Sequence, residues 1–190
     1  MFHAGGPVLL IPALFSIALA APPAEPVAKV GSCPSGYSTS GDFCKPGNSA
    51  RFAVVKTGSC PSGYSTSGDY CLAGSSARHA LPKTGSCPSG YSTSGSYCLQ
   101  SSSAPSPGRL EARALPRVGS CPSGYSTSGD YCKPGSSARY AVVKSGSCPS
   151  GYSTSGSYCL ASSGTTRLAV AKGGSCPSGF STSGAYCLSN

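Results

Sequence analysis

The stretch GSCPSGYSTSGDFC, from Gly31 to Cys44, decides the fold because near-identical copies of it occur six times in the 190-residue chain. The first cysteines of the copies stand at positions 33, 60, 87, 121, 148 and 176, so the repeat is about 27 residues long. A fixed period of this kind indicates a repeat architecture in which each copy is one small structural unit. The chain is therefore a tandem array of six modules.

The spacing of the twelve cysteines predicts how they pair. The two cysteines of a module are always 11 residues apart, whereas the separation from one module to the next varies from 16 to 23. Because a disulfide needs α carbons about 4.4–6.8 Å apart, the constant interval favours bridges within modules. The rival scheme, which joins Cys44 to Cys60 and continues along the chain, stays open at this point. The predicted pairs are Cys33–Cys44, Cys60–Cys71, Cys87–Cys98, Cys121–Cys132, Cys148–Cys159 and Cys176–Cys187.

Each cystine loop contains the residues of a β-hairpin. Pro34 and Gly36 stand second and fourth in the segment 33–36, which is the preference of a type I turn, and Gly41 can take a positive φ at a second turn. Residues 37–39 can pair back onto residues 43–44. The loop is thus expected to be a hairpin closed by its own disulfide.

A further strand is predicted after each module. Residues 51–56 place a short apolar run between Arg51 and Lys56, and we interpret them as a strand with one wetter face. Pro82 and Pro116 stand where Val55 and Val143 stand in other copies. Because proline cannot donate to a ladder, this strand is expected at a sheet edge or as a loose connector.

Composition excludes a single large core. Beyond residue 20 there are 16 Val plus Leu, three Phe and no Ile in 170 residues, or about 11%, which is well below the roughly 20% of a chain that builds an apolar core. We therefore expect an all-β, small disulfide-rich fold. It would be an elongated tandem array of six cystine-stapled β-hairpin modules, with loops and little or no helix after the signal peptide.

The signal peptide is assigned to residues 1–20. The apolar run Val8–Ala20 is too short for the roughly 20 residues of a membrane span, and it ends in the small-x-small pattern of a cleavage site. No transmembrane segment is expected in the mature chain. Export predicts a secreted, extracellular or cell-surface location, with periplasm or envelope as alternatives, and an oxidising compartment suits the cysteines.

The mature chain is organised as two triplets of modules. The expected division is an N-terminal linker at 21–30, a triplet at 31–99, a Ser/Pro-rich linker and connector at 100–118, and a triplet at 119–190. Residues 33–59 and 121–147 differ at only four of 27 positions. We infer that a cassette of three modules was duplicated.

A basic residue stands four positions before each first cysteine, in a chain whose formal net charge is +9. Stacked modules would align these residues into a stripe that attracts anionic polymers. The alternative is that scattered cations keep a Ser/Gly-rich chain soluble and cap strand ends. The candidate anion-binding residues are Lys29, Lys56, Lys83, Arg117, Lys144 and Lys172.

Each module also carries two aromatic residues, such as Tyr37 and Phe43 in the first. We interpret them as a miniature core that packs on the cystine. The alternative is a row of stacking platforms for sugar rings or bases.

Enzymatic chemistry lacks the residues it needs. The mature chain has one histidine, His79, in a slot otherwise filled by Phe52, Ala114, Tyr140 and Leu168, so a Ser/His/Asp arrangement would exist in one module at most. The cysteine spacing does not match a zinc site. We expect no enzyme, no cofactor and no metal.

The string CPSGYSTSGxYC and its ARxAVxK connector resemble exported bacterial tandem-repeat proteins with CPxGYxxSGxYC modules, which are mostly uncharacterised. The likeness covers Val30 to Cys187 and brings no site residues with it. The expected function is an exported, non-enzymatic structural or adhesive repeat protein, with self-association or anionic surface polymers as partners. The alternative is a multivalent binder of anionic polymers (polysaccharide, cell wall or extracellular nucleic acid) through a periodic Lys/Arg and Tyr surface, without specific nucleic-acid recognition.

Overall fold

The computed structural model describes residues 21–101 and 110–190. The predicted signal peptide and most of the Ser/Pro-rich insert lie outside the described residues. The described part is all-β and contains no helix, so it offers none that could span a membrane. The strands are β1 (Val27–Ala28), β2 (Tyr37–Ser40), β3 (Phe43–Pro46), β4 (Ala53–Val55), β5 (Tyr64–Ser67), β6 (Tyr70–Ala73), β7 (Ala80–Pro82), β8 (Tyr91–Ser94), β9 (Tyr97–Gln100), β10 (Leu115–Pro116), β11 (Tyr125–Ser128), β12 (Tyr131–Pro134), β13 (Ala141–Val143), β14 (Tyr152–Ser155), β15 (Tyr158–Ala161), β16 (Ala169–Ala171), β17 (Phe180–Ser183) and β18 (Tyr186–Ser189).

The strands form six three-stranded antiparallel sheets of the same strand order, which we call blades 1 to 6 in chain order. In blade 1 the strand order is β1-β3-β2. The hairpin β2-β3 pairs Thr39 with Cys44, and β1 pairs Val27 with the same cysteine. The second cysteine of every module therefore lies on the central strand of its blade.

All six disulfides lie within modules, as the constant spacing predicted. In blade 1 the α carbons of Cys33 and Cys44 are 5.4 Å apart, inside the range that a disulfide requires. The second cysteine of each pair has no exposed surface. The blade 2 cystine packs with Tyr64 of its own module and with Tyr97 of blade 3, and the cystines of blades 3, 4 and 5 repeat this arrangement, so the small cores lie between successive blades.

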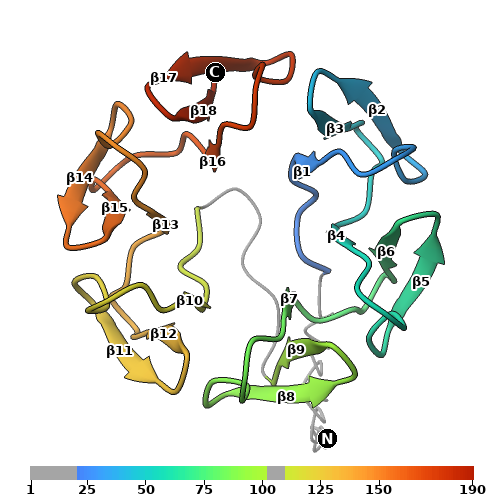
Figure 1. Cartoon of the computed structure of the whole chain (residues 1–190), viewed down its shortest axis with the longest axis horizontal. Coiled ribbons are helices and arrows are strands. Elements are labelled where there is room, and N and C mark those ends of the chain that lie inside the picture. Colours follow the sequence, from blue (N-terminus) through green and yellow to red (C-terminus); the bar gives the residue numbers. More distant parts are fainter. Residues whose placement is uncertain (1–20, 102–109) are drawn as a thin grey trace, which may run out of the picture.

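The six blades are arranged in a closed ring around a common centre (Figure 1). The hairpins lie outside, and the strands β1, β4, β7, β10, β13 and β16 lie innermost. Blade 6 meets blade 1, because the Ser178 amide donates a 2.9 Å hydrogen bond to Ser40 Oγ. The expectation of an elongated array was therefore wrong, although the cystine-stapled hairpins themselves are confirmed.

Ring closure follows from the repetition of one contact. The amide of the serine after Cys-Pro donates to a strand serine of the next blade, as Ser35 does to Ser67 Oγ at 3.1 Å. The same contact occurs at all six junctions, including the one between the two ends of the chain. Because equal interfaces turn each blade by an equal angle, the array curves until its ends meet, as in other radially repeated sheets.

The connectors belong to the blades that follow them. Residues 27–28 and 115–116 were assigned to linkers, yet they form β1 and β10, the inner strands of blades 1 and 4. These inner strands lie at the sheet edge, as the prolines predicted. In blade 3, Pro82 of β7 pairs opposite Tyr97 of β9. The two triplets accordingly join in one ring.

The first turn of the hairpin differs from the expected one. The Tyr37 amide donates to the Pro34 carbonyl at 3.0 Å, so the turn spans residues 34–37, and Gly36 at its third position has a φ of 85°. A positive φ there defines a type II turn, and the predicted type I turn over 33–36 was wrong. The second turn agrees with expectation: Gly41 has a φ of 59° and opens a two-residue hairpin loop.

Candidate functional site

The aromatic residues before the second cysteines lie between blades. The Tyr70 hydroxyl of blade 2 accepts a 2.6 Å hydrogen bond from the Val30 amide and donates to the Ala28 carbonyl at 3.0 Å. Five of the six junctions carry this pair of bonds. Their tyrosines have no exposed surface: Tyr70, Tyr97, Tyr131, Tyr158 and Tyr186.

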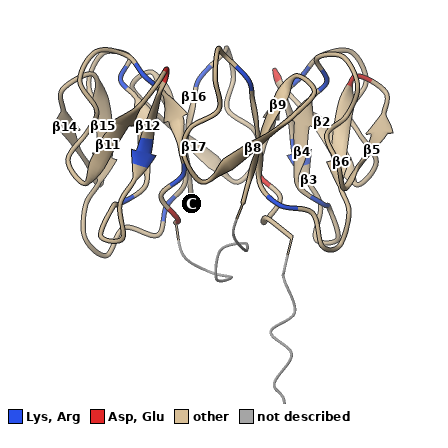
Figure 2. Ribbon diagram, turned by 90° about the horizontal axis from the view of Figure 1, so that it is seen from below, with Lys and Arg blue, Asp and Glu red and all other residues tan. Residues whose placement is uncertain are grey.

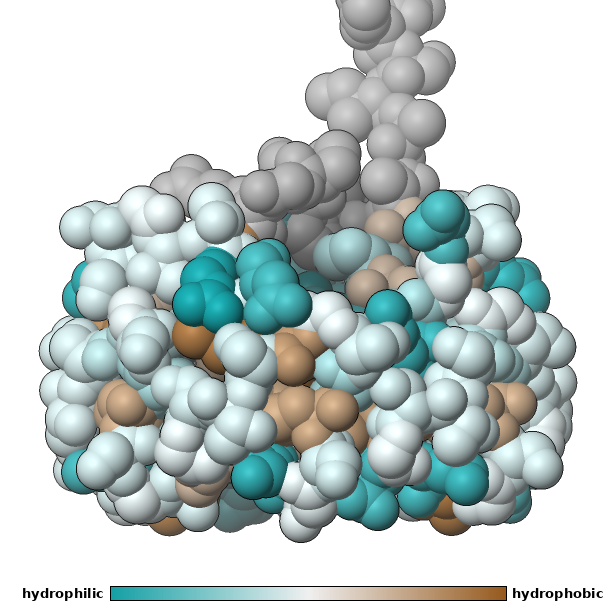
Figure 3. Space-filling view, turned by 90° about the horizontal axis from the view of Figure 1, so that it is seen from above, coloured by the Kyte–Doolittle hydropathy of each residue, from teal (hydrophilic) through white to brown (hydrophobic). Residues whose placement is uncertain are grey.

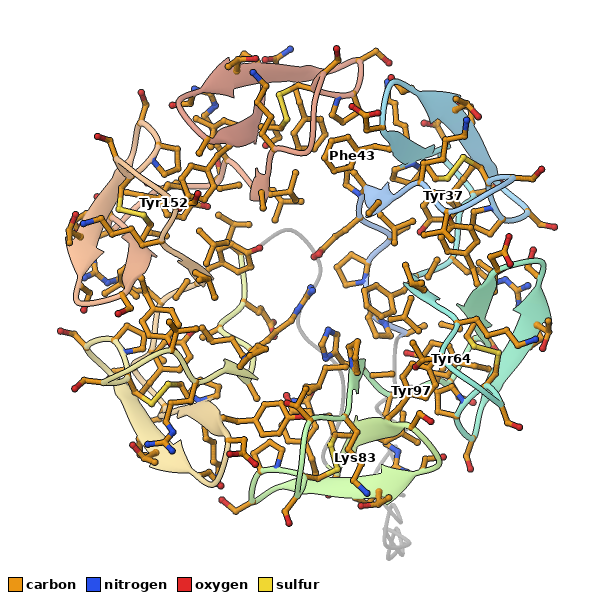
Figure 4. The ribbon with its side chains drawn as sticks, in the orientation of Figure 1. Tyr37, Phe43, Tyr64, Lys83, Tyr97 and Tyr152 are labelled. Carbon is orange, nitrogen blue, oxygen red and sulfur yellow. A yellow bond between two sulfur atoms is a disulfide. The ribbon has the colours of Figure 1, made fainter. Side chains whose placement is uncertain are left out.

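The sixth junction, between blades 6 and 1, differs because Phe43 stands at this position without a hydroxyl (Figure 4). Other contacts act there. The Ser175 amide donates to Asp42 Oδ2 at 3.1 Å, and Lys45 Nζ donates to Ser178 Oγ at 2.9 Å. Ring closure therefore depends on polar contacts near the surface rather than on a buried tyrosine.

The other aromatic series is also part of the packing. The Tyr37 and Tyr64 hydroxyls donate to the carbonyls of Arg51 and Arg78, each at 2.8 Å. Burial raises the pKa of both phenols above their usual range, and it raises the pKa of Tyr152 to about 12. These tyrosines form no exposed row of stacking platforms, which agrees with their interpretation as a miniature core.

The six candidate anion-binding residues are all exposed and occupy equivalent places in the ring. The Lys29 amide donates to the Asp42 carbonyl at 2.8 Å, and each counterpart donates to the hairpin turn of its own blade. All six therefore lie at the end of the blades where the hairpins turn. We call this end the basic face, defined by Lys29, Lys56, Lys83, Arg117, Lys144 and Lys172.

Acidic residues share the basic face but do not balance it. The turns of three blades carry Asp42, Asp69 and Asp130, and Figure 2 shows basic and acidic positions together along the upper rim. The six cations outnumber these three carboxylates. Figure 3 shows that much of the outer wall has intermediate hydropathy, with many of the hydrophilic residues near the rims. The expected stripe is thus a circle of cations around one face.

A second feature occupies the centre of the ring. In the inner strand of each blade, one residue pairs with the second cysteine, as Val27 pairs with Cys44 in blade 1. The residue two positions before it differs in each of the six blades. From the sequence, Ala114 was expected at the position equivalent to His79. The strand register shows that Arg113 occupies this position in blade 4, because Leu115 pairs with Cys132. We call these residues the central cluster: Glu25, Phe52, His79, Arg113, Tyr140 and Leu168.

Members of the central cluster meet across the ring. Glu25 of blade 1 and Arg113 of blade 4 form an ion pair at 2.7 Å, with side chains only 21% and 15% exposed. The Arg113 guanidinium also lies over the Phe52 ring, 5.9 Å from its centroid. Phe52 in turn contacts the His79 ring at 5.1 Å between centroids. Blades from opposite sides of the ring are therefore joined at its centre.

Burial sets the protonation states of the central cluster. Desolvation, aided by the Arg113 charge, lowers the pKa of His79 to about 3, so the imidazole is neutral at pH 7. Burial acts to lower the pKa of Arg113, but the Glu25 carboxylate and two nearby tyrosines more than offset it and leave that pKa raised. Desolvation also raises the pKa of Tyr140. The centre thus holds one ion pair, a neutral imidazole and a neutral phenol.

Two buried nitrogens of the central cluster have no hydrogen-bond partner among residues 21–101 and 110–190: His79 Nδ1 and Arg113 Nε. A buried polar group without a partner is uncommon in proteins and calls for an explanation. Beside Arg113 lies a cavity of about 250 Å³, lined by Glu25, Tyr140, Leu168 and Glu111 among others. A larger groove of about 510 Å³ adjoins it over the connectors that lead into blades 4, 5 and 6.

Sequence reasoning found the basic face but missed the central cluster. The sequence does contain a signal for this cluster. One position of the repeat holds a different residue in every copy, and Glu25 occupies that position before the first module. Comparisons of the chain with protein-family models, curated proteins and solved structures found no match. The geometry of the ring is therefore the basis for assigning its function.

Proposed function

We propose that the protein is an exported, non-enzymatic adhesive module that holds anionic polymers of a cell surface or of the extracellular space. The observation that carries this proposal is the basic face, where six exposed cations stand at equivalent places around a closed ring. A chain of repeating negative charges can contact several of these cations at once. Contacts that are weak singly then add up through avidity.

The ring supports this role in two further ways. Six disulfides suit an oxidising environment outside the cytosol. Closure also leaves no unpaired blade at either end of the array, which favours adhesion through a face over end-to-end assembly into a rod. The tyrosines contribute to the framework of the ring rather than to the polymer-binding surface.

Binding of the mature protein to a sulfated polysaccharide at low and high salt tests the proposal. We expect retention at low ionic strength that falls steeply as salt screens the charges. Changing Lys29, Lys83 and Lys144 to Gln removes three charges from alternate blades and should weaken binding at least tenfold.

A matched control removes three charges elsewhere. Arg51, Arg78 and Arg139 stand five residues before Lys56, Lys83 and Lys144 of the basic face. In extended backbone, five residues span roughly 16 Å. Changing these three arginines to Gln lowers the net charge equally but should weaken binding far less. Equal losses in the two triple variants would mean that net charge alone acts, and absence of retention at low salt would contradict the proposal.

A further inference from the structure

The central cluster departs from the repetition that governs the rest of the ring. The hairpins, cystines and junction serines recur with few changes, whereas the six inward positions hold an acid, a base, an imidazole, a phenol, a phenyl and an aliphatic side chain. If the six blades shared one structural requirement at this position, they would carry the same residue there. The centre therefore serves something that lacks sixfold symmetry.

The polar groups at the centre favour an uncharged ligand. Glu25 and Arg113 form an ion pair, so the carboxylate and the guanidinium largely offset each other's charge. The Glu25 carboxylate in the wall of the cavity disfavours an anion. The guanidinium in turn disfavours a cation.

The same groups favour a ligand rich in hydroxyls. A hydroxyl both donates and accepts hydrogen bonds, so it can accept from the Arg113 guanidinium while it donates to the Glu25 carboxylate, both of which line the cavity. Leu168, Leu110 and the Tyr140 ring supply apolar surface to the wall, and Thr166 adds one more hydroxyl. Sites for small molecules combine such apolar surfaces with a few polar groups in fixed positions.

The size and access of the cavity limit the ligand further. About 250 Å³ is below the range of roughly 300–1,000 Å³ for drug-sized ligands, which suits a molecule of one sugar ring. Pro23 and Thr166 line the cavity and are exposed, so it opens to solvent. We propose that the centre of the ring binds a neutral, hydroxyl-rich molecule of monosaccharide size through Arg113, Glu25 and Tyr140.

Titration of the isotope-labelled mature protein with single sugars, followed by NMR, tests this proposal. The probes are neutral hexoses and N-acetylhexosamines, with a uronic acid and an amino sugar as charged counterparts. We expect saturable shifts of central-cluster signals with at least one neutral sugar and weaker effects from its charged counterparts. Absence of saturable shifts with every neutral sugar, or tighter binding of the uronic acid, would overturn the proposal.

Two variants locate the site. Leu168→Trp fills the cavity without removing a polar group, and it should abolish the shifts while the melting temperature changes little. Arg113→Lys keeps the charge opposite Glu25 but removes the planar set of guanidinium donors, and it should weaken binding at least tenfold. Sugar binding that survives Leu168→Trp in a folded protein would contradict a site in the cavity.

The site is independent of the basic face. The variant in which Lys29, Lys83 and Lys144 are changed to Gln should bind the neutral sugar with unchanged affinity. Loss of sugar binding in that variant would place the sugar on the basic face and overturn the central site. Failure of polymer binding, conversely, would leave the titration of the central cavity unaffected.

Discussion

At the scale of single residues, one hydroxyl separates the closing junction from the other five. Tyr97 accepts from the Thr57 amide at 2.7 Å and donates to the Val55 carbonyl at 3.0 Å. Phe43 occupies the same place at the junction of blades 6 and 1 and makes neither bond. The junction where the chain ends meet therefore lacks two hydrogen bonds that the other five junctions have.

Adding that hydroxyl should stabilise the ring. Phe43→Tyr would allow the two hydrogen bonds of the other junctions, each of which contributes about 1 kcal/mol net. For a chain of this size, 1 kcal/mol raises the melting temperature by about 2–4 °C. Thermal unfolding followed by circular dichroism measures the change.

The reverse substitution is the control. Tyr97→Phe removes both bonds from an internal junction and should lower the unfolding free energy by about 1–3 kcal/mol. If Tyr97→Phe destabilises the protein and Phe43→Tyr does not stabilise it, the closing junction is not built like the others.

His79 should make the stability of the ring depend on pH. Its pKa is lowered to about 3, against about 6.5 in an unfolded chain. Between these values the unfolded state binds a proton that the folded state does not, so stability falls as pH is lowered through this window, by up to about 1.4 kcal/mol per unit. Arg113 and Glu25 are the charged groups of the central cluster nearby.

Melting temperatures at pH 7.5 and 4.5 test this dependence. The drop between the two should be smaller in His79→Leu than in the unchanged protein. The carboxylates are common to both proteins, so the difference isolates the imidazole. An equal drop would show that His79 is exposed to solvent and is not part of a buried centre.

At the scale of the strands and turns, the local residues predicted most of the blade. Cysteines 11 residues apart and Gly41 between two short runs indicated the hairpin and its disulfide. The first turn was wrong because Pro34 was assigned to the second position of a turn over 33–36, whereas the observed turn begins at Pro34 and has Gly36 at its third position. The Gly36 conformation depends on the paired strands, since the Gly36 carbonyl accepts from the Gly47 amide at 2.9 Å.

Two equivalent hairpin turns offer a matched test of blade packing. Gly41 and Gly68 have the same φ of 59°, so alanine at either position costs about 1 kcal/mol or more in backbone strain. A Cβ at Gly68 would meet nothing within 4 Å, whereas one at Gly41 would lie 3.2 Å from the Ser175 Cβ of blade 6. Gly41→Ala should therefore destabilise the protein more than Gly68→Ala does.

Urea unfolding of the two variants gives the difference. Equal losses of unfolding free energy would mean that blade 6 does not pack on the turn of blade 1, and so would contradict a closed ring.

At the scale of the whole molecule, the sequence predicted six units but not their arrangement. A repeat period says nothing about the angle between successive units, and an elongated array and a ring share every hairpin. The angle depends on small contacts such as that of Ser178 with Ser40 Oγ. The central cluster was missed for the same reason, since Glu25 and Arg113 meet only after the ring closes.

The ring retains the twofold pattern of the duplicated cassette. Lys45 of blade 1 donates to Ser178 Oγ of blade 6, and its counterpart Lys133 of blade 4 donates to Ser89 Oγ of blade 3 at 3.1 Å. These are the two junctions at which one triplet meets the other. The last blade of each triplet therefore presents a surface that fits the first blade of either triplet.

A single triplet should consequently form a ring with a second copy of itself. Residues 21–101 contain three whole blades, and Glu25→Gln in this triplet avoids two carboxylates meeting at the centre, where Glu25 meets Arg113 in the full chain. In a dimer of that variant, Lys45 of each copy would reach Ser89 of the other, as Lys133 does within the full chain. Light scattering during gel filtration should give twice the mass of the triplet, whereas the full chain should be a monomer. Lys45→Glu should weaken the dimer, because it places a carboxylate where a donor is needed at both junctions. A triplet that remains a folded monomer at high concentration would show that the covalent link between the cassettes, rather than complementary junctions, holds the two halves of the ring together.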